Sequence, residues 1–515
     1  MRRRLSGGVI FLMALAALAS MATAAYAARG KRSHRARVVS LAIQAPDTPT
    51  EPVSGTAACT TPAPVHTYAY YHCYAPSDIR AAYDVNGVAP LSSGEGNMGQ
   101  GQTIVLVDSY GSPTAASDLK YFHDTFFPTL PDPNFSEVYP LGAPDYNNVA
   151  HGSGLSGPSA AANWSGEATL DIEWSYAIAP LAHIVLLAVP PAETEGVQGF
   201  PNLFKAIQQA INTYPAGTIF SQSFGVTEQT FGGAAGTQTS RFDAVYKSAI
   251  AKGDTVFASS GDNGSTGTSK QHKETTSYSY ATDGWPASSP WVTAAGGTQL
   301  QYGWTWDPTS DTPVLPDGSQ NPAYFNWTPG GDTQAVWNES FEPAASGGGP
   351  SALYPMPSWQ SSVASVIGQN ARGVPDIAWN AAVNGGVLVY ITAFPNYQRS
   401  GWHVYGGTSA ASPQLAGVTG LVNAARQDAG KGPIGYLNRL LYSLPSSDYR
   451  DVVPVTEGTA ASGHLVNNQL WMYNADGSVS PGPVPGYPTL PGWDMTTGFG
   501  SPVVGPFVAD LAAAP

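Results

Sequence analysis

The segment "QTIVLVDSYG", residues 102–111, carries the strongest strand signal in the chain. An apolar, β-branched run that ends on polar residues and glycine is typical of a buried strand followed by a turn. Similar runs occur at 183–189, 218–223, 255–259 and 291–295, and helical patterns at 202–212 and 241–251 alternate with them. This alternation predicts an α/β fold, a mostly parallel sheet flanked by helices in a single large domain.

Polar residues follow these runs at the points where the strands should end. The stretches are "VDSYG" 107–111, "SQSFG" 221–225, "SSGDNG" 259–264 and the glycine-rich "GGTS" 406–409. In parallel sheets, functional residues gather beyond the carboxyl ends of the strands, so we expect these stretches to share one edge. Residues 303–345, rich in Trp, Asn, Asp and Gly, are predicted to form a surface insertion.

The composition points to a secreted globular protein. The chain has 515 residues, of which 42% are hydrophobic and 11% are charged, well below the usual quarter. Eight of the 22 basic residues precede residue 38, and all 36 acidic residues follow it. Such an acidic remainder argues against nucleic acid as a partner and is compatible with work at low pH.

The N-terminus has the pattern of a secretory signal. Three arginines, an apolar run from Val9 to Ala19 and "AYA" at 25–27 predict a signal peptide over 1–27. The run is too short to span a membrane, so a secreted, extracellular protein with no membrane partner is expected. Residues 28–72 are predicted to be a short N-terminal tail or linker, and residues 73–515 to form the single large domain. Cys59 and Cys73 are expected to form one disulfide, with metal ligation as the alternative.

The stretch "GGTSAASP", residues 406–413, presents Ser409 as a candidate nucleophile. Small neighbours allow close approach of a substrate, and helical amides after Ser409 would help bind an oxyanion. Pro413 fits the first helical turn, where its missing N–H costs little. The alternative is that Ser409 only caps a helix.

A serine nucleophile needs a base, and one candidate lies in "SGEATLDIEWSYAIAP", 165–180. Glu167 and Asp171 are four residues apart, on one side of a helix. Apolar neighbours favour burial, where a shared proton would relieve the repulsion between the two carboxylates. Two exposed acids on a solvated helix face are the alternative.

Two further acids are candidates. Asp108 ends a strand and precedes His151, a pair that would suit a subtilisin-like mechanism, although "HGSGLSGPS" is a loop by composition. Asp262, in a glycine-rich turn, is either a turn former or, when protonated, a donor to an oxyanion.

In this order, E-x-x-x-D at 167–171, S-G-D-x-G at 260–264 and G-G-T-S-A-x-x-P at 406–413 resemble the motifs of the sedolisin family of serine-carboxyl peptidases. The likeness covers about residues 73–512. Further similar blocks are "CYAPSDIRAAYDV" 73–85, "GQGQTIVLVDSYGSPTAASDL" 99–119, "WPASSPWVTAAGGTQL" 285–300, "GGGPS" 347–351, "RGVPDIAWNA" 372–381 and "PGWDMTTGFGSP" 491–502.

The resemblance implies a subtilisin-like fold and a secreted endopeptidase that cleaves proteins through an acyl-enzyme at acidic pH. Ser409 would be the nucleophile, Glu167 the base, Asp171 its orienting partner and Asp262 the oxyanion donor. A glutamate titrates near about 4.3, so it accepts a proton where histidine is already charged.

The resemblance also implies one Ca²⁺ ion in the region 448–498. Its ligands would be the side chains of Asp451 and Asp494 and the carbonyls of Val452, Leu490 and Gly492. Leu490 stands where the family has glycine, and two loop-capping aspartates are the alternative. The family's large folded pro-domain would not fit between the signal peptide and Cys73.

Peptide substrates are expected to add a strand to exposed backbone edges at Ser223, Phe224, Gly225 and Gly348. We expect a monomer. Two rival hypotheses remain: a subtilisin-like protease using Asp108, His151 and Ser409, and a catalytically inactive secreted protein-binding scaffold.

Overall fold

A computed structural model describes most of the chain from Cys73 onward and two short pieces before it. The described residues are 39–40, 43–44, 73–146, 158–189, 199–271, 274–301, 333–339, 343–383, 385–398, 400–454, 466–474 and 479–515. The predicted signal peptide, Cys59 and His151 lie outside them.

An eight-stranded sheet forms the centre of the molecule. Its order is β14-β13-β9-β7-β4-β6-β5, with β19 also paired to β13. All pairs are parallel except β13 with β14. The strands are β4 (Thr103–Ser109), β5 (Phe135–Val138), β6 (His183–Val189), β7 (Ile219–Gln222), β9 (Thr255–Ser259), β13 (Thr293–Gln301), β14 (Thr333–Val336) and β19 (Ile377–Asn380).

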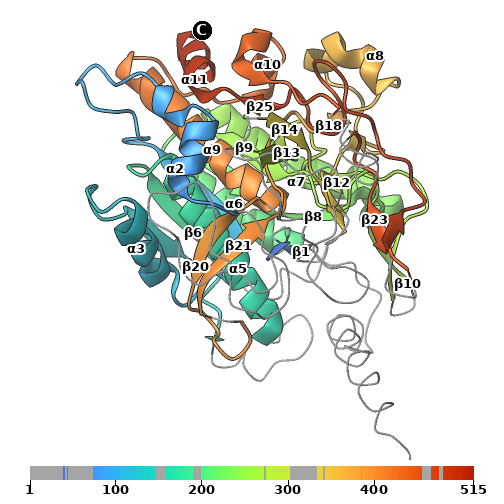
Figure 1. Cartoon of the computed structure of the whole chain (residues 1–515), viewed down its shortest axis with the longest axis horizontal. Helices are drawn as coiled ribbons and strands as arrows, with labels where there is room; N and C mark the ends of the chain where they lie inside the picture. The colour runs from blue at the N-terminus through green and yellow to red at the C-terminus, as the bar shows by residue number, and fades with distance from the viewer. Residues whose placement is uncertain are drawn as a thin grey trace, which may run out of the picture.

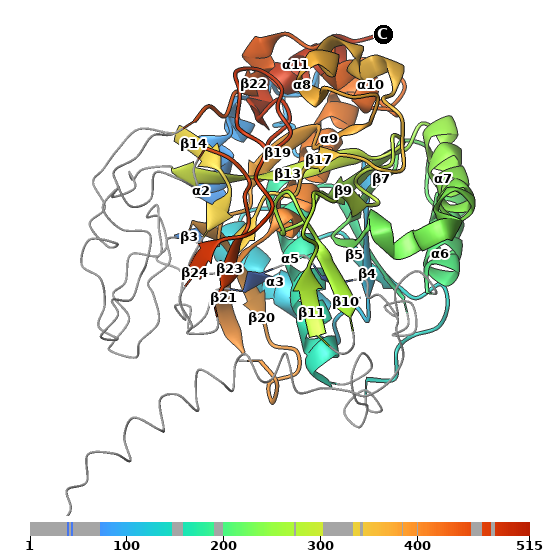
Figure 2. The same cartoon turned by 90° about the vertical axis from the view of Figure 1, so that its right-hand side faces the viewer.

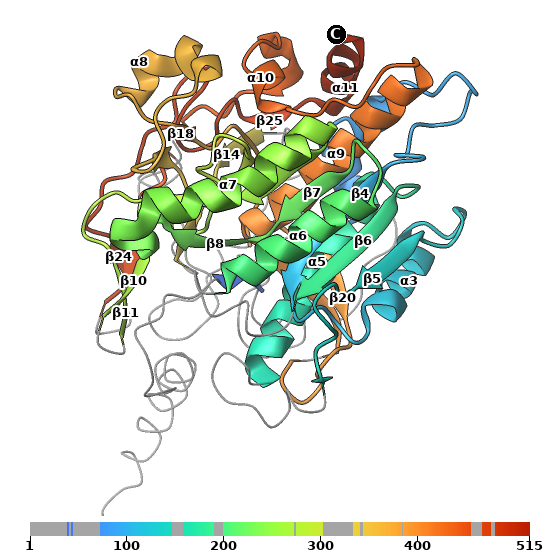
Figure 3. The same ribbon diagram turned by 180° about the vertical axis from the view of Figure 1, so that it is seen from behind.

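Alternation along the strands gives the sheet two apolar faces. In β4, Ile104 and Leu106 join a core with α5 (Pro158–Ile178) and α9 (Thr408–Asp428). Val105 and Val107 join a second core with α6 (Phe200–Thr213) and α7 (Ala235–Lys252). Figure 3 shows α6 and α7 in front of the sheet, and Figure 1 shows α9 and α5 on the opposite side. This arrangement confirms the predicted α/β fold.

Smaller sheets and helices surround this centre. One sheet has the order β1-β8-β12 and another β2-β21-β20-β3. The helices are α2 (Pro76–Ala82), α3 (Ala115–Phe126), α8 (Ala364–Ile367), α10 (Asn438–Leu441) and α11 (Val504–Ala513). The 3-10 helices are Val85–Gly87, Glu228–Ala234, Ser358–Val363 and Ser446–Asp448. Figure 2 shows α8, α10 and α11 together near the C-terminus.

The remaining strands are short, apart from β20 and β21, which have 6 residues each. They are β1 (Val39–Ser40), β2 (Ile43–Gln44), β3 (Cys73–Tyr74), β8 (Phe224–Thr227), β10 (Thr268–Gln271), β11 (Glu274–Ser277), β12 (Gly284–Trp285), β15 (Asn338–Glu339), β16 (Ala344–Ala345), β17 (Gly349–Pro350), β18 (Gly373–Val374), β20 (Gly386–Ile391), β21 (Gly401–Gly406), β22 (Tyr449–Arg450), β23 (Trp471–Tyr473), β24 (Val479–Pro481) and β25 (Ser501–Pro502).

Three local predictions need correction. The tail predicted over 28–72 contributes β1 and β2 to sheets of the main domain. The described end of the stretch 303–345 is not a surface insertion, because β14 joins the central sheet and Ala335 and Val336 are buried. Pro413 lies inside α9, beyond the first turn, where it offers no N–H to the carbonyl of Ser409.

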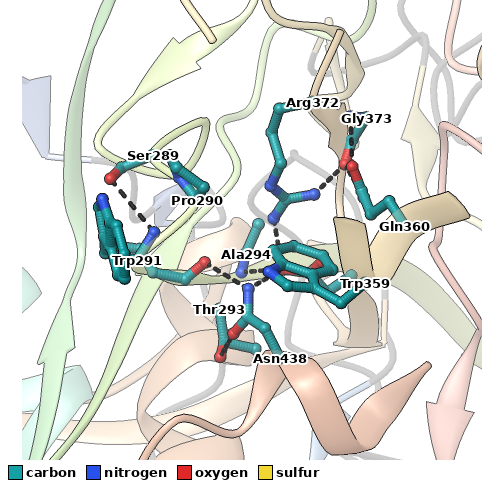
Figure 4. A network of polar contacts seen from close by, with 12 residues as sticks. Ser289, Pro290, Trp291, Thr293, Ala294, Trp359, Gln360, Arg372, Gly373 and Asn438 are labelled. Atoms are coloured by element: carbon teal, nitrogen blue, oxygen red, sulfur yellow. Dashed lines mark hydrogen bonds and ion pairs between the residues drawn. The ribbon is translucent and has the colours of Figure 1, made fainter. Parts of the chain in front are cut away.

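A buried polar network holds the sheet near β13 and β19 (Figure 4). Arg372 is fully buried, and its Nη2 donates to Asp376 Oδ2 at 2.5 Å. Asp376 Oδ2 also accepts the Ala294 N–H at 2.8 Å, and Asn438 Nδ2 donates to the Val292 carbonyl at 2.9 Å. A buried charge pair of this kind is sustained by such additional hydrogen bonds.

Among the helices in the described ranges, none combines the length and apolar character needed to cross a bilayer.

Candidate active site

Ser409 lies at the start of α9, where a strand turns sharply into a helix. β21 ends at Gly406, and Gly407 has φ 93°, a conformation that favours glycine. The Gly407 N–H donates to the Ala381 carbonyl at 2.7 Å, which holds the turn in place. Ser409 is fully buried, and its Oγ has no hydrogen-bond partner among the described residues.

Helix α5 brings two carboxyl groups beside α9. Glu167 and Asp171 are both fully buried, as their apolar neighbours predicted, and α5 packs against α9. The Ser223 hydroxyl donates to Asp171 Oδ1 at 2.9 Å. A Cβ on Gly166 would lie 2.3 Å from the Tyr405 hydroxyl, so the absence of a side chain there lets α5 approach β21 closely.

Asp108 joins these two acids. It is 1% exposed at the end of β4; burial raises its pKa well above its usual value, and the charge of Glu167 raises it further. Burial also raises the pKa of Asp171, and the charges of Asp108 and Glu167 raise it further. Asp108 and Asp171 therefore retain protons at pH values where exposed acids have lost them. The sequence analysis assigned Asp108 only to the subtilisin-like alternative with His151. Its position at the end of a strand could also have indicated that it lies at the candidate site.

Asp262 follows β9 and is tied to the residue before Ser409. Its Oδ1 accepts the Thr408 N–H at 2.9 Å and the Thr408 hydroxyl at 2.8 Å. Its Oδ2 is buried with no hydrogen-bond partner in the described part of the chain. Burial raises the pKa of Asp262 to about 8, against the lowering effect of the Thr408 bonds. A protonated Oδ2 is therefore available to donate.

Thr408 is a residue of the candidate site that sequence reasoning missed. Besides its two bonds to Asp262, its hydroxyl accepts the Gly261 N–H at 3.1 Å, and its carbonyl accepts from the Ser259 hydroxyl at 3.0 Å. Thr408 thus fastens the start of α9 to the end of β9. Its position in "GGTS", directly before Ser409, was the feature of the sequence that could have indicated its place in the candidate site.

Two described histidines have local partners away from these acids. His123 Nδ1 lies 2.6 Å from the Tyr176 hydroxyl, and His183 Nε2 lies 2.8 Å from Ser136 Oγ. His183 begins β6, at the opposite end from the carboxyl edge of the sheet. His151 lies outside the described residues, so its predicted role as an alternative base stays a prediction.

The predicted peptide-binding edges are not open. β8, which contains Phe224 and Gly225, pairs with β1 on one side and β12 on the other. This corrects the expectation of an exposed edge there, because the chain's own N-terminal segment covers it. At Gly348, a Cβ would lie 2.1 Å from the Met495 carbonyl oxygen, so this glycine allows close backbone packing. Substrate contacts of Ser223, Phe224, Gly225 and Gly348 stay predictions.

The residues predicted to bind calcium lie on two adjoining loops. Asp451 Oδ2 accepts the Gly492 N–H at 2.8 Å, and Asp494 Oδ2 accepts the Leu490 N–H at 2.9 Å. The Val452 side chain is buried. Asp494 Oδ1 also accepts hydrogen bonds from Thr496 and Thr497, so both of its oxygens have protein partners. Calcium binding by the carboxylates and carbonyls of these two loops stays a prediction.

Cys73 is disulfide-bonded, as predicted. Its predicted partner, Cys59, lies outside the described residues.

Comparisons with known proteins identify a family for the chain. A family model described as the subtilase family matches residues 99–437. Kumamolisin of Bacillus sp. (strain MN-32) is 30% identical over 436 residues, covering 84% of this chain and 62% of kumamolisin. Sedolisin of Pseudomonas sp. (strain 101) is 31% identical over 312 residues, covering 60% of this chain and 43% of sedolisin. The chain thus spans less than two thirds of the length of either relative.

A solved structure supports the fold. Pseudomonas sedolisin, a serine-carboxyl proteinase complexed with two molecules of pseudo-iodotyrostatin, aligns with a TM-score of 0.57 and 24% identity. The alignment covers 86% of this chain and 98% of that chain. The chain belongs to the subtilase family, and kumamolisin and sedolisin are among the proteins that it is similar to.

Proposed function

We propose that this protein is a secreted endopeptidase of the serine-carboxyl class that hydrolyses proteins at acidic pH. The observation that carries the proposal is the carboxyl of Asp262, held by Thr408 immediately before Ser409 with Oδ2 left to donate. The buried acids of α5 supply the base. Similarity to kumamolisin and sedolisin supports the same assignment.

In this mechanism each carboxyl has a separate task. Ser409 Oγ attacks the substrate carbonyl while Glu167 accepts its proton, and Asp171, held by Ser223, orients Glu167. Asp262 donates a hydrogen bond to the oxyanion of the tetrahedral intermediate. Glu167 then protonates the leaving amine, and water hydrolyses the acyl-enzyme by the same route in reverse.

The two required protonation states set the limits of the working pH range. Glu167 must start ionised, and Asp262 must stay protonated, which its pKa of about 8 allows in acid. Activity should therefore fall as the pH rises through about 8, where Asp262 loses its proton.

The decisive experiment is digestion of a denatured protein by the purified chain between about pH 3 and pH 9. We expect wild-type cleavage in acid, with activity lost in Ser409→Ala and Glu167→Gln and retained in His151→Ala. An active Glu167→Gln together with an inactive His151→Ala would instead establish the subtilisin-like alternative. A wild-type chain inactive at every pH would favour the protein-binding scaffold.

We also propose a structural calcium site formed by the side chains of Asp451 and Asp494 and the carbonyls of Val452, Leu490 and Gly492. A bound ion would join the two loops and take no part in catalysis. Calcium at 100 times its Kd should raise the free energy of unfolding by about 2.7 kcal/mol. Thermal unfolding with calcium and with a chelator measures this shift, which Asp494→Asn should abolish. An equal melting temperature in both conditions would exclude the site.

A further inference from the structure

Three side chains with metal-binding atoms meet beside α3. They belong to His123, Asp124 and Asp132, and one nitrogen or oxygen atom of each lies within 4.8 Å of the other two. His123 Nε2 is 3.9 Å from Asp124 Oδ1 and 4.0 Å from Asp132 Oδ1. Figure 3 shows α3 beside β5 at the outer edge of the molecule. None of the three residues takes part in the proposed mechanism.

The end of α3 and the loop after it bring these side chains together. His123 and Asp124 lie in the last turn of the helix. The Phe127 N–H then donates to the His123 carbonyl at 2.7 Å, and the Leu130 N–H donates to the Phe127 carbonyl at 3.0 Å. These bonds turn the chain sharply as it leaves the helix. The loop that leads into β5 therefore places Asp132 beside α3.

His123 is held in the orientation that a metal-binding imidazole needs. Its side chain is 3% exposed, and its Nδ1 lies 2.6 Å from the hydroxyl of Tyr176 on α5. With the ring proton on Nδ1 donated to that oxygen, Nε2 carries the lone pair that a metal requires. Within the described ranges Nε2 makes no hydrogen bond, and the two carboxylates face it. Metal-bound histidines usually have such a partner on their second nitrogen.

The spacing and the atom types fit a zinc ion. Zinc bonds to imidazole nitrogen and carboxylate oxygen are about 2.0–2.2 Å long, so two ligands of one ion lie at most about 4.3 Å apart. Both distances from Nε2 are below that limit. The side chains of Asp124 and Asp132 are 54% and 78% exposed, so they can rotate towards the ion. Calcium and magnesium prefer oxygen ligands alone, whereas an imidazole suits zinc.

A lysine already places a positive charge between the two carboxylates. Lys120 Nζ is 2.5 Å from Asp124 Oδ1 and 3.5 Å from Asp132 Oδ1. Its side chain is partly exposed, and its flexible four-carbon stem lets the ammonium group move into solvent. Lys120 and a metal ion therefore compete for the same pair of carboxylates.

We propose that His123 Nε2 and the carboxylates of Asp124 and Asp132 bind a divalent transition metal ion of the zinc type, with water completing its coordination. The ion joins α3 to the loop before β5 and, through Tyr176, to α5. Tyr176 lies nine residues beyond Glu167 on α5, about 13 Å along the helix axis. The ion therefore stabilises the fold and takes no part in peptide hydrolysis.

The site is tested by calorimetric titration with zinc near neutral pH, in a Ser409→Ala background and with excess calcium to fill the proposed calcium site. We expect one zinc ion per chain. Asp132→Asn and His123→Asn should abolish binding, although His123→Asn keeps a polar atom for the Tyr176 hydroxyl. Glu95→Gln, which neutralises an exposed acid elsewhere, is the matched control and should bind zinc like its parent. If zinc binds equally to all four proteins, or to none, the proposal is wrong.

Two further variants test the geometry around the ion. Lys120→Gln should bind zinc more tightly than its parent, because the competing charge is gone. Tyr176→Phe should weaken binding by about 10–100-fold, as the loss of a partner of a ligating histidine does. Weaker binding to Lys120→Gln would contradict a shared pair of carboxylates, and unchanged binding to Tyr176→Phe would exclude the orienting role of Tyr176.

The stabilising role has its own readout. Excess zinc should raise the melting temperature of the parent chain and leave that of His123→Asn unchanged. A rise that persists in His123→Asn would place the ion elsewhere and overturn the assignment. Binding and unfolding need no peptidase activity, so these results stand whether or not the chain hydrolyses proteins.

Discussion

Thr408 illustrates how a single residue sets the state of a catalytic group. Its N–H and hydroxyl both bond Asp262 Oδ1, so the carboxyl is fixed with Oδ2 directed away from Thr408. The two hydrogen bonds from Thr408 favour the charged carboxylate of Asp262. Burial disfavours this charged form more strongly and raises the pKa of Asp262 to about 8. The balance leaves a neutral acid beside the nucleophile.

At this scale we predict that Asp262→Ala lowers kcat by about 10²–10³, because the oxyanion loses its donor. Asp262→Asn keeps a donor that does not titrate. It should retain far more activity than the alanine variant at pH 5 and should lack the wild-type loss of activity as the pH rises through about 8. Initial rates across pH measure both effects. Equal rates for wild type and Asp262→Ala would exclude the donor role.

At the scale of elements, α5, which carries the proposed base Glu167, packs closely against α9, which carries the proposed nucleophile Ser409. Glycine on α9 makes this approach possible: a Cβ on Gly417 would lie 2.7 Å from the Ile178 Cβ and 3.1 Å from the Ser175 carbonyl oxygen. Gly166 serves the same purpose between α5 and β21. Close packing here is therefore a condition of the chemistry as well as of stability.

We predict that Gly417→Leu forces the two helices apart. It should cost about 1–3 kcal/mol of unfolding free energy, as overpacking does, and should lower kcat because Glu167 moves relative to Ser409. The matched control is Gly236→Ala on α7, where an added Cβ meets nothing within 4 Å. Denaturant unfolding and kcat are measured on both. A Gly417→Leu chain with wild-type kcat would show that the helix spacing does not govern catalysis.

Over the whole molecule, many carboxyl groups are buried and have raised pKa values. Burial raises the pKa of Asp78 to about 6, of Asp254 to about 7 and of Asp262 to about 8, and raises that of Glu173 well above its usual value. In the unfolded chain such acids titrate near about 4. The folded state therefore keeps protons that the unfolded state has released, so stability is highest below about pH 4 and declines as the pH rises through these values.

This predicts a melting temperature that falls between pH 4 and pH 8, measured by calorimetry. Glu173→Gln provides the matched test, because its amide resembles the protonated acid and keeps an acceptor for the Tyr390 N–H. The variant should melt like wild type at pH 4 and at a higher temperature than wild type at pH 8. A wild-type melting temperature that climbs toward neutral pH would contradict the prediction.

The sequence by itself determined the α/β class, the strands and the helix that carries Glu167 and Asp171. These features depend on local periodicity and on runs of apolar residues. The motif spacing also indicated Ser409 and Asp262. Only the tertiary structure decided that Asp108 joins the acid cluster, that Thr408 holds Asp262, and that residues 39–40 and 43–44 pair with β8 and β21. All three features depend on contacts between residues that are far apart in the chain. Burial and backbone pairing stabilise these contacts, and a local sequence pattern does not predict either one.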